Sequence, residues 1–398
     1  MNITIYPRRL NGTVHAIPSK SQAHRLLICA AFADKETVLI CPQTNQDIEA
    51  TADCLRALGA QIRRTYDGYT VKPIESIPVK AILNCRESGS TLRFMLPVAG
   101  ALGVDATLLM AGRLPKRPLS PLWEEMEQMG CSLSRPTDSA IHCTGKLKCG
   151  NYAISGNVSS QFITGLLFAC ALLQGKSQIT VTSTLESKPY IDMTQQALKS
   201  FGVNTDNFQI NGCFPFISPG MLNIEGDWSN GAFFLAARAM GNDVTVTGLN
   251  PASVQGDLAV EGILSAMDRP CSVSAADIPD LIPILSVAAA HHYGAVFTDI
   301  QRLRLKESDR VASVISMLHA FGINAEATED TLTVFPGKFH SGTVDAVNDH
   351  RIAMSAAIAA TVADGPVTIV GAECVSKSYP TFWEEYVKLG GHYEQYIR

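Results

Sequence analysis

Four short segments concentrate lysine and arginine in a chain that is slightly acidic as a whole. The 398 residues include 32 Lys and Arg against 37 Asp and Glu, which gives a net charge of −5. One run of charge is usually a solvated face, but several at a regular spacing indicate a fold that directs many cations to one place. Such a place suits phosphate and carboxylate groups, which Arg binds with a planar fork and Lys with a compact charge. The segments are residues 113–118, 302–310, 348–351 and 376–380.

Three predicted helix starts carry neutral serine or glycine beside cations. A helix N-terminus offers unpaired N–H groups and a partial positive charge, which favours phosphate. Serine is also a preferred helix cap, so capping alone would explain these residues. At three later helix starts the residue is aspartate. Capping is the favoured interpretation for Asp227, whereas for Asp280 and Asp349 capping and a functional role stay equally open. The first three starts are Ser19-Lys20-Ser21 with Arg25, Ser88-Gly89 with Arg86 and Arg93, and Ser159-Ser160-Gln161.

One structural unit recurs along the chain. Each copy is a helix of small apolar residues, a turn and a β-branched strand, followed by a second, more amphipathic helix. The second helix is expected to end at a glycine, which accepts the left-handed conformation. Five copies have that glycine, and the fourth has residues 267–270 there instead. The six helix starts lie 53 to 71 residues apart. We therefore predict an α/β protein of six βαβαββ-type units, three per domain. The five glycines are Gly59, Gly130, Gly202, Gly322 and Gly390.

Composition narrows the class of protein. A chain of this length exceeds one ordinary core, so two domains are expected. The apolar stretches, such as residues 166–173 and 282–290, are too short to span a bilayer. The first residues lack the pattern of a signal peptide, and a nucleic-acid binder would be basic, which this chain is not. The eleven cysteines include no CxxC pair. They are expected to be free thiols in a reducing cytosol, most of them buried as small apolar residues.

The basic segments and helix starts occur in an order that resembles the 5-enolpyruvylshikimate-3-phosphate synthase family of enolpyruvyl transferases. The resemblance runs essentially end to end and rests on the ordered set rather than on any one tripeptide. It implies a two-domain, inside-out α/β barrel fold, with one domain of residues 19–225 and another of residues 1–18 plus 226–398, joined by two crossover strands. The segments that carry it are residues 19–21, 88–93, 116–118, 159–161, 187–190, 278–280, 304–310 and 348–351, with Arg25 and Lys377.

The resemblance also implies a role for individual residues. Proton transfer would fall to Asp280 at the substrate hydroxyl and to Glu307 at the methylene carbon, with Lys20 stabilising the charge that develops. Each has a plain structural alternative: Asp280 as a helix cap, Glu307 as an ion-pair partner of Lys306 or Arg310, and Lys20 as a surface residue. Shikimate-3-phosphate would be bound by Lys20, Ser21, Arg25, Ser159, Ser160, Gln161, Ser187, Tyr190, Asp280 and Lys306. Phosphoenolpyruvate would be bound by Lys20, Gly89, Arg117, Gln161, Arg310, Arg351 and Lys377.

The implied reaction transfers the enolpyruvyl group of phosphoenolpyruvate to the 5-hydroxyl of shikimate-3-phosphate and releases phosphate. This is a step of the shikimate pathway toward chorismate and the aromatic amino acids. No metal and no organic cofactor are implied, and the sequence has no GxGxxG, P-loop, HExxH or cysteine–histidine cluster. The expected partners are the two small-molecule substrates, without nucleic acid or membrane. We expect a cytoplasmic monomer that glyphosate inhibits in competition with phosphoenolpyruvate.

Two other functions are compatible with the same fold. The sister enzyme, UDP-N-acetylglucosamine enolpyruvyl transferase, carries a reactive cysteine in the loop before its Arg-Pro, whereas residues 110–118 contain none. A catalytically inactive relative would have lost the acid–base residues, yet Lys20, Asp280 and Glu307 are all present. The chain also departs from the enteric-type enzymes at three positions, whose contacts with substrate stay open: Arg86, where a small residue is common, and Glu87 and Arg302, where those enzymes carry Asn.

Overall fold

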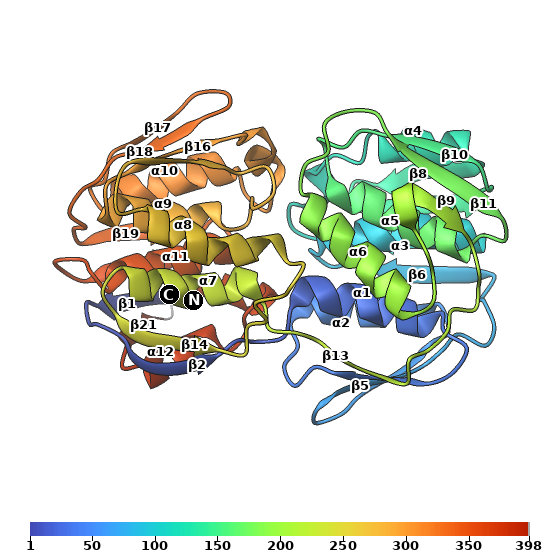
Figure 1. Cartoon of the computed structure of the whole chain (residues 1–398), viewed down its shortest axis with the longest axis horizontal. Coiled ribbons are helices and arrows are strands. Elements are labelled where there is room, and N and C mark those ends of the chain that lie inside the picture. Colours follow the sequence, from blue (N-terminus) through green and yellow to red (C-terminus); the bar gives the residue numbers. More distant parts are fainter. Residues whose placement is uncertain (397–398) are drawn as a thin grey trace. The chain divides into compact units, whose positions relative to one another are not determined.

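The computed structural model describes residues 1–396 and divides the chain into two compact units (Figure 1). The inserted unit is Pro18–Glu225. The split unit combines Met1–Ile17 with Gly226–Arg398. The chain therefore leaves the split unit after Ile17, builds the whole inserted unit, and returns after Glu225.

The sheets of the inserted unit share one pattern, in which a parallel strand pair is extended by antiparallel strands. The first has the order β13-β3-β5-β4, the second β6-β7-β9-β8 and the third β10-β11-β12. The parallel pairs are β13 with β3, β6 with β7, and β10 with β11. Their bounds are β3 Thr37–Ile40, β4 Gln61–Arg64, β5 Gly68–Lys72, β6 Lys80–Asn84, β7 Asp105–Leu109, β8 Cys131–Thr137, β9 Ala140–Gly145, β10 Asn151–Ile154, β11 Lys176–Val181, β12 Gln209–Asn211 and β13 Met221–Asn223.

Two sheets of the split unit repeat this pattern, whereas the third, β14-β2, is a parallel pair alone within residues 1–396. Strands from both segments of the unit take part. Its sheets have the orders β14-β2, β15-β16-β18-β17 and β19-β20-β1-β21, and each contains one parallel pair. Strand β1 lies between β20 and β21, so the N-terminal residues complete a sheet made of the last part of the chain. The bounds are β1 Asn2–Tyr6, β2 Asn11–His15, β14 Asp243–Thr247, β15 Cys271–Ser274, β16 Ala295–Thr298, β17 Ala325–Ala327, β18 Leu332–Val334, β19 Gly342–Asp345, β20 Val367–Val370 and β21 His392–Tyr396.

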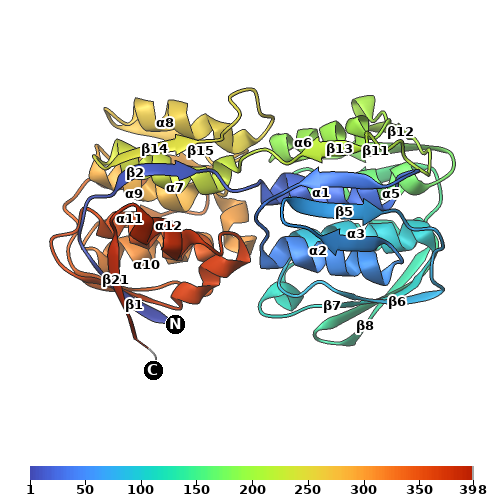
Figure 2. The same cartoon turned by 90° about the horizontal axis from the view of Figure 1, so that it is seen from below.

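In each unit the most apolar helices lie in the middle and the strands lie around them (Figures 1 and 2). Every residue of α11 is buried, as is every residue of α5 except Gln161. Strands such as β10 alternate exposed and buried residues, as expected for a sheet with one face to water. The helices are α1 Lys20–Ala31, α2 Gln46–Ala57, α3 Gly89–Leu102, α4 Leu122–Gln128, α5 Ser160–Leu172, α6 Lys188–Ser200, α7 Trp228–Ala239, α8 Val260–Ala266, α9 Ile282–His291, α10 Arg310–Ala320, α11 His350–Ala360 and α12 Phe382–Lys388.

Five of the six predicted helix starts are confirmed as side-chain caps. The cap residue in each accepts a backbone N–H of the first turn, and these residues are Ser19, Ser88, Ser159, Asp227 and Asp349. The capping interpretation of Asp280 is wrong. Helix α9 begins at Ile282 after Leu281, and no side chain caps it. The five glycines predicted to end the second helices all have positive φ, between 77° and 112°.

The structure also describes the cysteines, the lengths of the helices and the possible metal ligands. All eleven cysteines are free thiols, and eight of them are buried. Within residues 1–396, no helix combines the length and the apolar character that crossing a bilayer requires. The same residues contain no group of three or more His, Cys, Asp and Glu side chains placed to hold a metal ion.

Candidate functional site

Lys20 is the first residue of α1 and lies against an acidic side chain. Its ammonium is 3.0 Å from Asp47 Oδ2, and the two side chains are only 15% and 16% exposed. The interpretation of Lys20 as a surface residue is therefore wrong. Sequence reasoning does not identify Asp47, because an acidic residue in the first turn of a helix is an ordinary feature that needs no functional explanation.

The start of α3 lies directly beneath two guanidinium groups. A Cβ atom at Gly89 would be 2.5 Å from Arg117 Nη1 and 2.7 Å from Arg93 Nη1. Gly89 thus allows both arginines to approach the backbone at a helix N-terminus, where a bound anion would also meet unpaired N–H groups. Arg93 is buried, and the sequence offered only its place beside a helix start as a sign of its role.

Gln161 connects the start of α5 with the start of α3. Its Oε1 accepts Arg93 Nη1 at 3.0 Å and its Nε2 donates to Ser90 Oγ at 2.9 Å. Ser159, which caps α5, accepts the backbone N–H of Gln161. Two helix N-termini of the inserted unit and their polar side chains are therefore held together by direct hydrogen bonds.

Arg25 connects α1 with α6. Its guanidinium donates to Ser21 O at 2.6 Å, to Tyr190 O at 2.8 Å and to Thr194 Oγ1 at 2.8 Å. Burial lowers the pKa of Arg25 to about 10, so the group still carries its charge at neutral pH. Ser187, directly before α6, is buried in the left-handed conformation. The contacts of Arg25 thus bring Ser21, Ser187 and Tyr190 to one place.

In the split unit, Arg310 is shared by three carboxylates. Its Nη1 donates to Asp280 Oδ1 at 2.7 Å, its Nη2 to Glu307 Oε2 at 2.5 Å, and its Nε to Asp349 Oδ2 at 3.1 Å. The Arg310 side chain is 1% exposed. Burial would lower its pKa, but Asp349, Glu307 and Asp280 outweigh burial and raise it above the ordinary value.

Asp280 is surrounded by further cations. Arg351 Nη2 donates to its Oδ2 at 2.9 Å, and Lys306 Nζ lies 3.6 Å from its Oδ1. Burial would raise the pKa of Asp280, but Arg351, Lys306 and Arg310 hold it well below the usual range. Burial lowers the pKa of Lys306 to about 8 despite the neighbouring Asp280. Asp280 is therefore ionised at neutral pH, whereas the pKa of Lys306, at about 8, lies close to neutral pH.

Lys377 lies at the end of the 3₁₀ turn Ala372–Lys377 and reaches the loop before α11. Its Nζ donates to Asn348 O at 2.9 Å. Val347 and Asn348 both have positive φ, which turns the chain just before the cap of α11. The contact places Lys377 beside the helix start that carries Arg351.

Comparison with known proteins matches residues 5–277 and 269–386 to the family described as EPSP synthase (3-phosphoshikimate 1-carboxyvinyltransferase). The chain belongs to the EPSP synthase family.

Curated relatives of this EPSP synthase family member span its whole length. A 3-phosphoshikimate 1-carboxyvinyltransferase from Clostridium kluyveri is 37% identical over 423 aligned residues, which cover 99% of this chain and 98% of the relative. Another, from Clostridium beijerinckii, is 36% identical over 430 aligned residues and 99% of each chain. The predicted family and the predicted transferase class are confirmed.

Two solved structures share the fold of this EPSP synthase family member. The structure of EPSP synthase from Acinetobacter baumannii aligns with a TM-score of 0.80 and 24% identity, covering 99% of this chain and all of that one. The enolpyruvyl transferase NikO from Streptomyces tendae aligns with a TM-score of 0.79 and 19% identity, covering 99% of this chain and 98% of that one. The predicted two-domain enolpyruvyl transferase fold is confirmed.

The three residues that depart from the enteric-type pattern have partners of their own. Arg86 adopts a positive φ of 51° and donates to Asp53 at 2.6 Å, so its guanidinium is bound to α2. Glu87 lies against Gly112, where a Cβ would be 2.5 Å from the Glu87 carboxyl carbon. Arg302 is largely buried and close enough to Lys306 to lower the pKa of that lysine. Arg302 thus lies beside a predicted ligand residue, Lys306.

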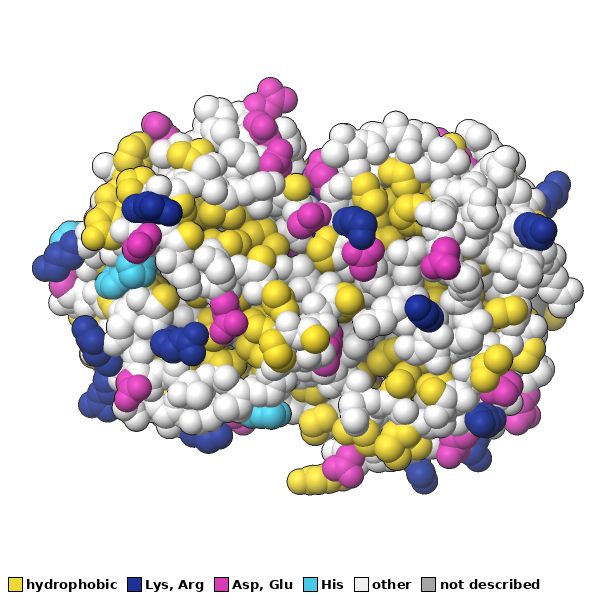
Figure 3. Space-filling view, in the orientation of Figure 1, with side chains coloured by type: hydrophobic (Ala, Val, Ile, Leu, Met, Phe, Trp, Pro, Cys, Tyr) yellow, Lys and Arg dark blue, Asp and Glu magenta, His cyan; other side chains and the backbone are white. Residues whose placement is uncertain are grey.

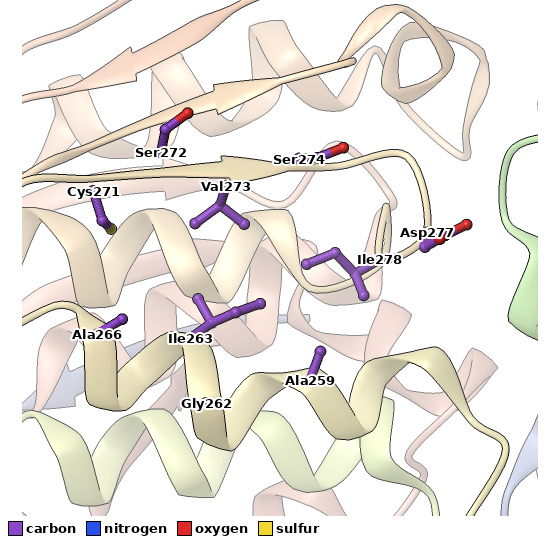
Figure 4. A pocket seen from close by; sticks show the side chains of 10 residues that line it. All are labelled: Ala259, Gly262, Ile263, Ala266, Cys271, Ser272, Val273, Ser274, Asp277 and Ile278. Carbon is purple, nitrogen blue, oxygen red and sulfur yellow. The ribbon is translucent and has the colours of Figure 1, made fainter.

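A pocket of about 420 Å³ in the split unit is lined by none of the predicted catalytic or ligand residues, although Ile278 of its lining precedes Asp280 by two positions (Figure 4). It is formed by α8 and β15, and Ile263, Cys271, Val273 and Ile278 are among its lining side chains. Asp277, at one end, is the charged residue of its lining. The pocket therefore lacks the cations that a phosphate ester requires. Figure 3 shows one face of the molecule, on which Lys and Arg side chains are scattered singly and form no basic patch.

Proposed function

We propose that this chain transfers the enolpyruvyl group of phosphoenolpyruvate to the 5-hydroxyl of shikimate-3-phosphate, with release of phosphate. The observation that carries the proposal is the Arg310 cluster, in which two candidate proton-transfer groups, Asp280 and Glu307, share one buried guanidinium. The proposal is also supported by the relatives named 3-phosphoshikimate 1-carboxyvinyltransferase, which match the chain over its whole length. The reaction belongs to the shikimate pathway of aromatic amino-acid biosynthesis.

In the inserted unit, we assign the serine and arginine side chains near α1, α5 and α6 to shikimate-3-phosphate. Ser159, Ser160 and Ser187 bind its phosphate, Ser21 and Arg25 its ring hydroxyls, and Gln161 and Tyr190 lie along the ring. The phosphate of phosphoenolpyruvate binds at Gly89 with Arg117 and Lys20. This assignment is supported by the capped starts of α1, α3 and α5, where Ser19, Ser88 and Ser160 are buried, and by the guanidinium groups above Gly89.

In the split unit, we assign the cations around Asp280 to both substrates. Arg310 and Arg351 take the carboxylate of phosphoenolpyruvate, Lys377 its phosphate, and Lys306 contacts shikimate-3-phosphate. A buried guanidinium suits a carboxylate because it offers two parallel donors. The two substrates together bear several negative charges, which the clustered cations of the split unit offset.

The chemistry is an addition followed by an elimination. The 5-hydroxyl oxygen forms a bond to the central carbon of phosphoenolpyruvate while its proton passes to Asp280, and Glu307, in its protonated form, gives a proton to the methylene carbon. The methyl group then returns a proton to Glu307 as the bond to the phosphate oxygen breaks, and the departing phosphate takes the proton from Asp280. Asp280 is ionised, as a proton acceptor must be, although the cations around it also weaken it as a base. Lys20 stabilises the charge that develops near the reacting oxygens.

The sister reaction on UDP-N-acetylglucosamine has less support. Residues 110–118 contain no cysteine, and Cys85 and Cys131, the nearest in sequence, are buried. Burial and pairing with Cys54 raise the pKa of the Cys85 thiol well above its ordinary value, which makes it a poor nucleophile. The proposal therefore names shikimate-3-phosphate as the acceptor. We also propose that the enzyme is monomeric and cytoplasmic and that glyphosate inhibits it.

Released phosphate tests the proposal. The purified chain is incubated with phosphoenolpyruvate, shikimate-3-phosphate, or both, with and without excess chelator. We expect release that requires both substrates and persists with chelator. The assignment is wrong if release does not exceed the control without enzyme, or if it appears only when UDP-N-acetylglucosamine replaces shikimate-3-phosphate.

A further inference from the structure

The three carboxylates on Arg310 differ in how firmly they are held. Asp349 is 0% exposed, and it also accepts Ser308 Oγ at 2.9 Å and caps α11 by accepting the backbone N–H of Arg351. Asp280 and Glu307 are 20% and 27% exposed. Asp349 is thus built into the fold, whereas the other two carboxylates lie on the accessible side of the guanidinium.

The contacts also divide the guanidinium into two edges. Asp349 takes Nε, whereas Asp280 and Glu307 take the two terminal nitrogens, Nη1 and Nη2. The pair of terminal nitrogens is one of the edges that an incoming carboxylate can bind with two parallel hydrogen bonds. In this structure the protein's own acidic side chains occupy that edge as a ligand carboxylate would.

We propose that a substrate carboxylate replaces Asp280 and Glu307 on the Nη edge of Arg310, while Asp349 keeps Nε, so that binding itself frees both proton-transfer groups from Arg310. Asp280 keeps its contacts with Arg351 and Lys306. The inference rests on the proposed function, which assigns the carboxylate of phosphoenolpyruvate to Arg310. It adds that the acidic groups are held inactive by the residue that binds the substrate. Arg310 is in this sense a positioning residue for Asp280 and Glu307 as well as a ligand for substrate.

The exchange has an electrostatic consequence for Asp280. The charged groups that face it are Arg310 from α10, Arg351 from α11, Lys306 from the preceding loop, and the carboxyl of Asp257 from the 3₁₀ turn Gly256–Ala259. A ligand carboxylate adds a negative charge beside Asp280 and takes one of its hydrogen bonds. Both changes favour the protonated form. Asp280 becomes a stronger base when the ligand arrives.

Carbon-13 NMR of the aspartate carboxyl groups can follow this change directly. The intact chain is labelled at aspartate, saturated with shikimate-3-phosphate and titrated with acid, and the Asp280 resonance is identified by its loss in Asp280→Asn. The probe is 2-phosphoglycolate, which has a phosphate and a carboxylate but no double bond to react. Methyl phosphate, which lacks the carboxylate, is the matched ligand. We expect the Asp280 midpoint to rise by about one pH unit or more with 2-phosphoglycolate, a tenfold change in proton affinity, and to stay in place with methyl phosphate.

Two variants separate the role of the planar Arg310 guanidinium, with its parallel donors, from the role of its positive charge. Arg310→Lys keeps the charge but cannot hold two acidic groups on parallel donors, so the shift with 2-phosphoglycolate should shrink. Arg304→Lys is the control, because Arg304 lies on the turn before the cluster and contacts Thr328 O at 2.8 Å and Asp309 at 3.9 Å, neither of them a carboxylate on Arg310. It should keep the full shift.

The outcomes distinguish the inference from the proposed function. If the chain releases phosphate but the Asp280 midpoint is the same with either ligand, or 2-phosphoglycolate does not bind, the inference is wrong and the proposed function stands. If no phosphate is released from the two substrates, the proposed function fails. The wild-type titration decides the inference even if Arg310→Lys does not fold.

Discussion

Asp280 owes its properties to distant parts of the split unit rather than to its own helix. It precedes α9 without capping it, and its oxygens accept from Arg310 and Arg351, which lie 30 and 71 residues further along the chain. These cations keep the carboxylate charged in a partly buried place where burial alone would neutralise it. A residue that could have been an ordinary cap is thereby available for proton transfer.

Replacing either acidic group should separate chemistry from folding. We expect Asp280→Asn and Glu307→Gln to lower kcat by about 10²–10⁴-fold, the usual loss when a proton-transfer group is removed. Binding of shikimate-3-phosphate, measured by titration calorimetry, should change much less. Asp277→Asn, an exposed residue in the same loop, is the control and should keep kcat within about twofold. Near wild-type kcat in either site variant would contradict the assigned roles.

Asp257 should make stability depend on pH. Burial raises its pKa to about 7, with Asp280 adding to the effect and Arg351 opposing it. A carboxyl with a raised pKa stabilises the folded chain most below its unfolded pKa of about 4, and this contribution is lost as pH rises to 7. Asp257→Asn carries no charge, so its stability relative to wild type should grow by about 3 kcal/mol between pH 5 and pH 8.

Urea unfolding at the two pH values measures this effect. The control is Asp268→Asn, because the Asp268 side chain is 76% exposed and lies in water rather than in the core. Its stability relative to wild type should not depend on pH. An Asp257→Asn variant whose relative stability is equal at pH 5 and pH 8 would show that the buried carboxyl does not titrate in this range.

Residue types and order predicted most of the candidate site, but not the residues that act through others. Lys20, Asp280 and Glu307 stand in recognisable motifs. Asp47 and Asp257 do not, and Arg93, although it lies in segment 88–93, had no predicted role, because the part of these residues depends on contacts such as that of Arg93 with Gln161, 68 positions away. Such pairs are formed by the packing of separate repeats, and a single sequence gives no sign of which side chains will meet.

At the scale of elements, a chain of hydroxyl groups fixes the first helix starts of the inserted unit. His24 of α1 bonds to Thr51 of α2 at 2.7 Å, Thr51 to Thr91 of α3 at 2.8 Å, and Thr91 to the cap Ser88 at 2.8 Å. Burial lowers the pKa of His24, so the ring stays neutral and can serve this chain. The position of Gly89 is thus determined by three helices together.

Gly89→Ala should disturb ligands more than the fold. The added methyl would meet the ends of Arg117 and Arg93, which are flexible enough to move, rather than backbone. Displacing Arg117 should raise the Michaelis constant for phosphoenolpyruvate. The inhibition constant of glyphosate, a longer molecule, should rise further. Steady-state kinetics with and without glyphosate measure both constants.

The control for this change is another glycine with room for a methyl group. A Cβ at Gly262 of α8 meets nothing within 4 Å, so Gly262→Ala should leave both constants unchanged. Because alanine favours a helix over glycine, it should also stabilise the chain by up to about 1 kcal/mol. If Gly89→Ala binds phosphoenolpyruvate and glyphosate as wild type does, the phosphate of the one and the phosphonate of the other do not bind at the start of α3.

At the scale of the whole molecule, the repeat pattern predicted the secondary structure because most repeats carry the same helix caps and helix-ending glycines. The exceptions are the fourth repeat, which lacks the glycine, and the fifth, in which Asp280 caps no helix. The hydroxyl or aspartate starts and the glycine ends mark the helices locally. Sheet order was not local in the same way. Strand β13 pairs with β3 and β14 with β2, across 183 and 232 residues in register, and no periodicity reveals such partners. They follow from the chain leaving one unit and returning to it.

This path of the chain predicts that the inserted unit can fold as a separate fragment, whereas the C-terminal segment of the split unit cannot. The inserted unit is continuous, its strands pair only with one another, and its buried cluster runs from Ala23 to Ile224. Residues 18–225 alone should therefore unfold cooperatively in urea, followed by circular dichroism and by Trp123, the tryptophan of this unit. This fragment should release no phosphate, since Asp280, Glu307 and Arg310 are absent.

Residues 226–398 are the matched fragment and should not fold, because they lack β1, whose Ile3 and Ile5 are fully buried and which joins β20 to β21. Adding residues 1–17 as a separate peptide should restore structure to that fragment. A cooperative transition in 226–398 alone, or none in 18–225, would show that the cores are not divided as the strand pairing indicates.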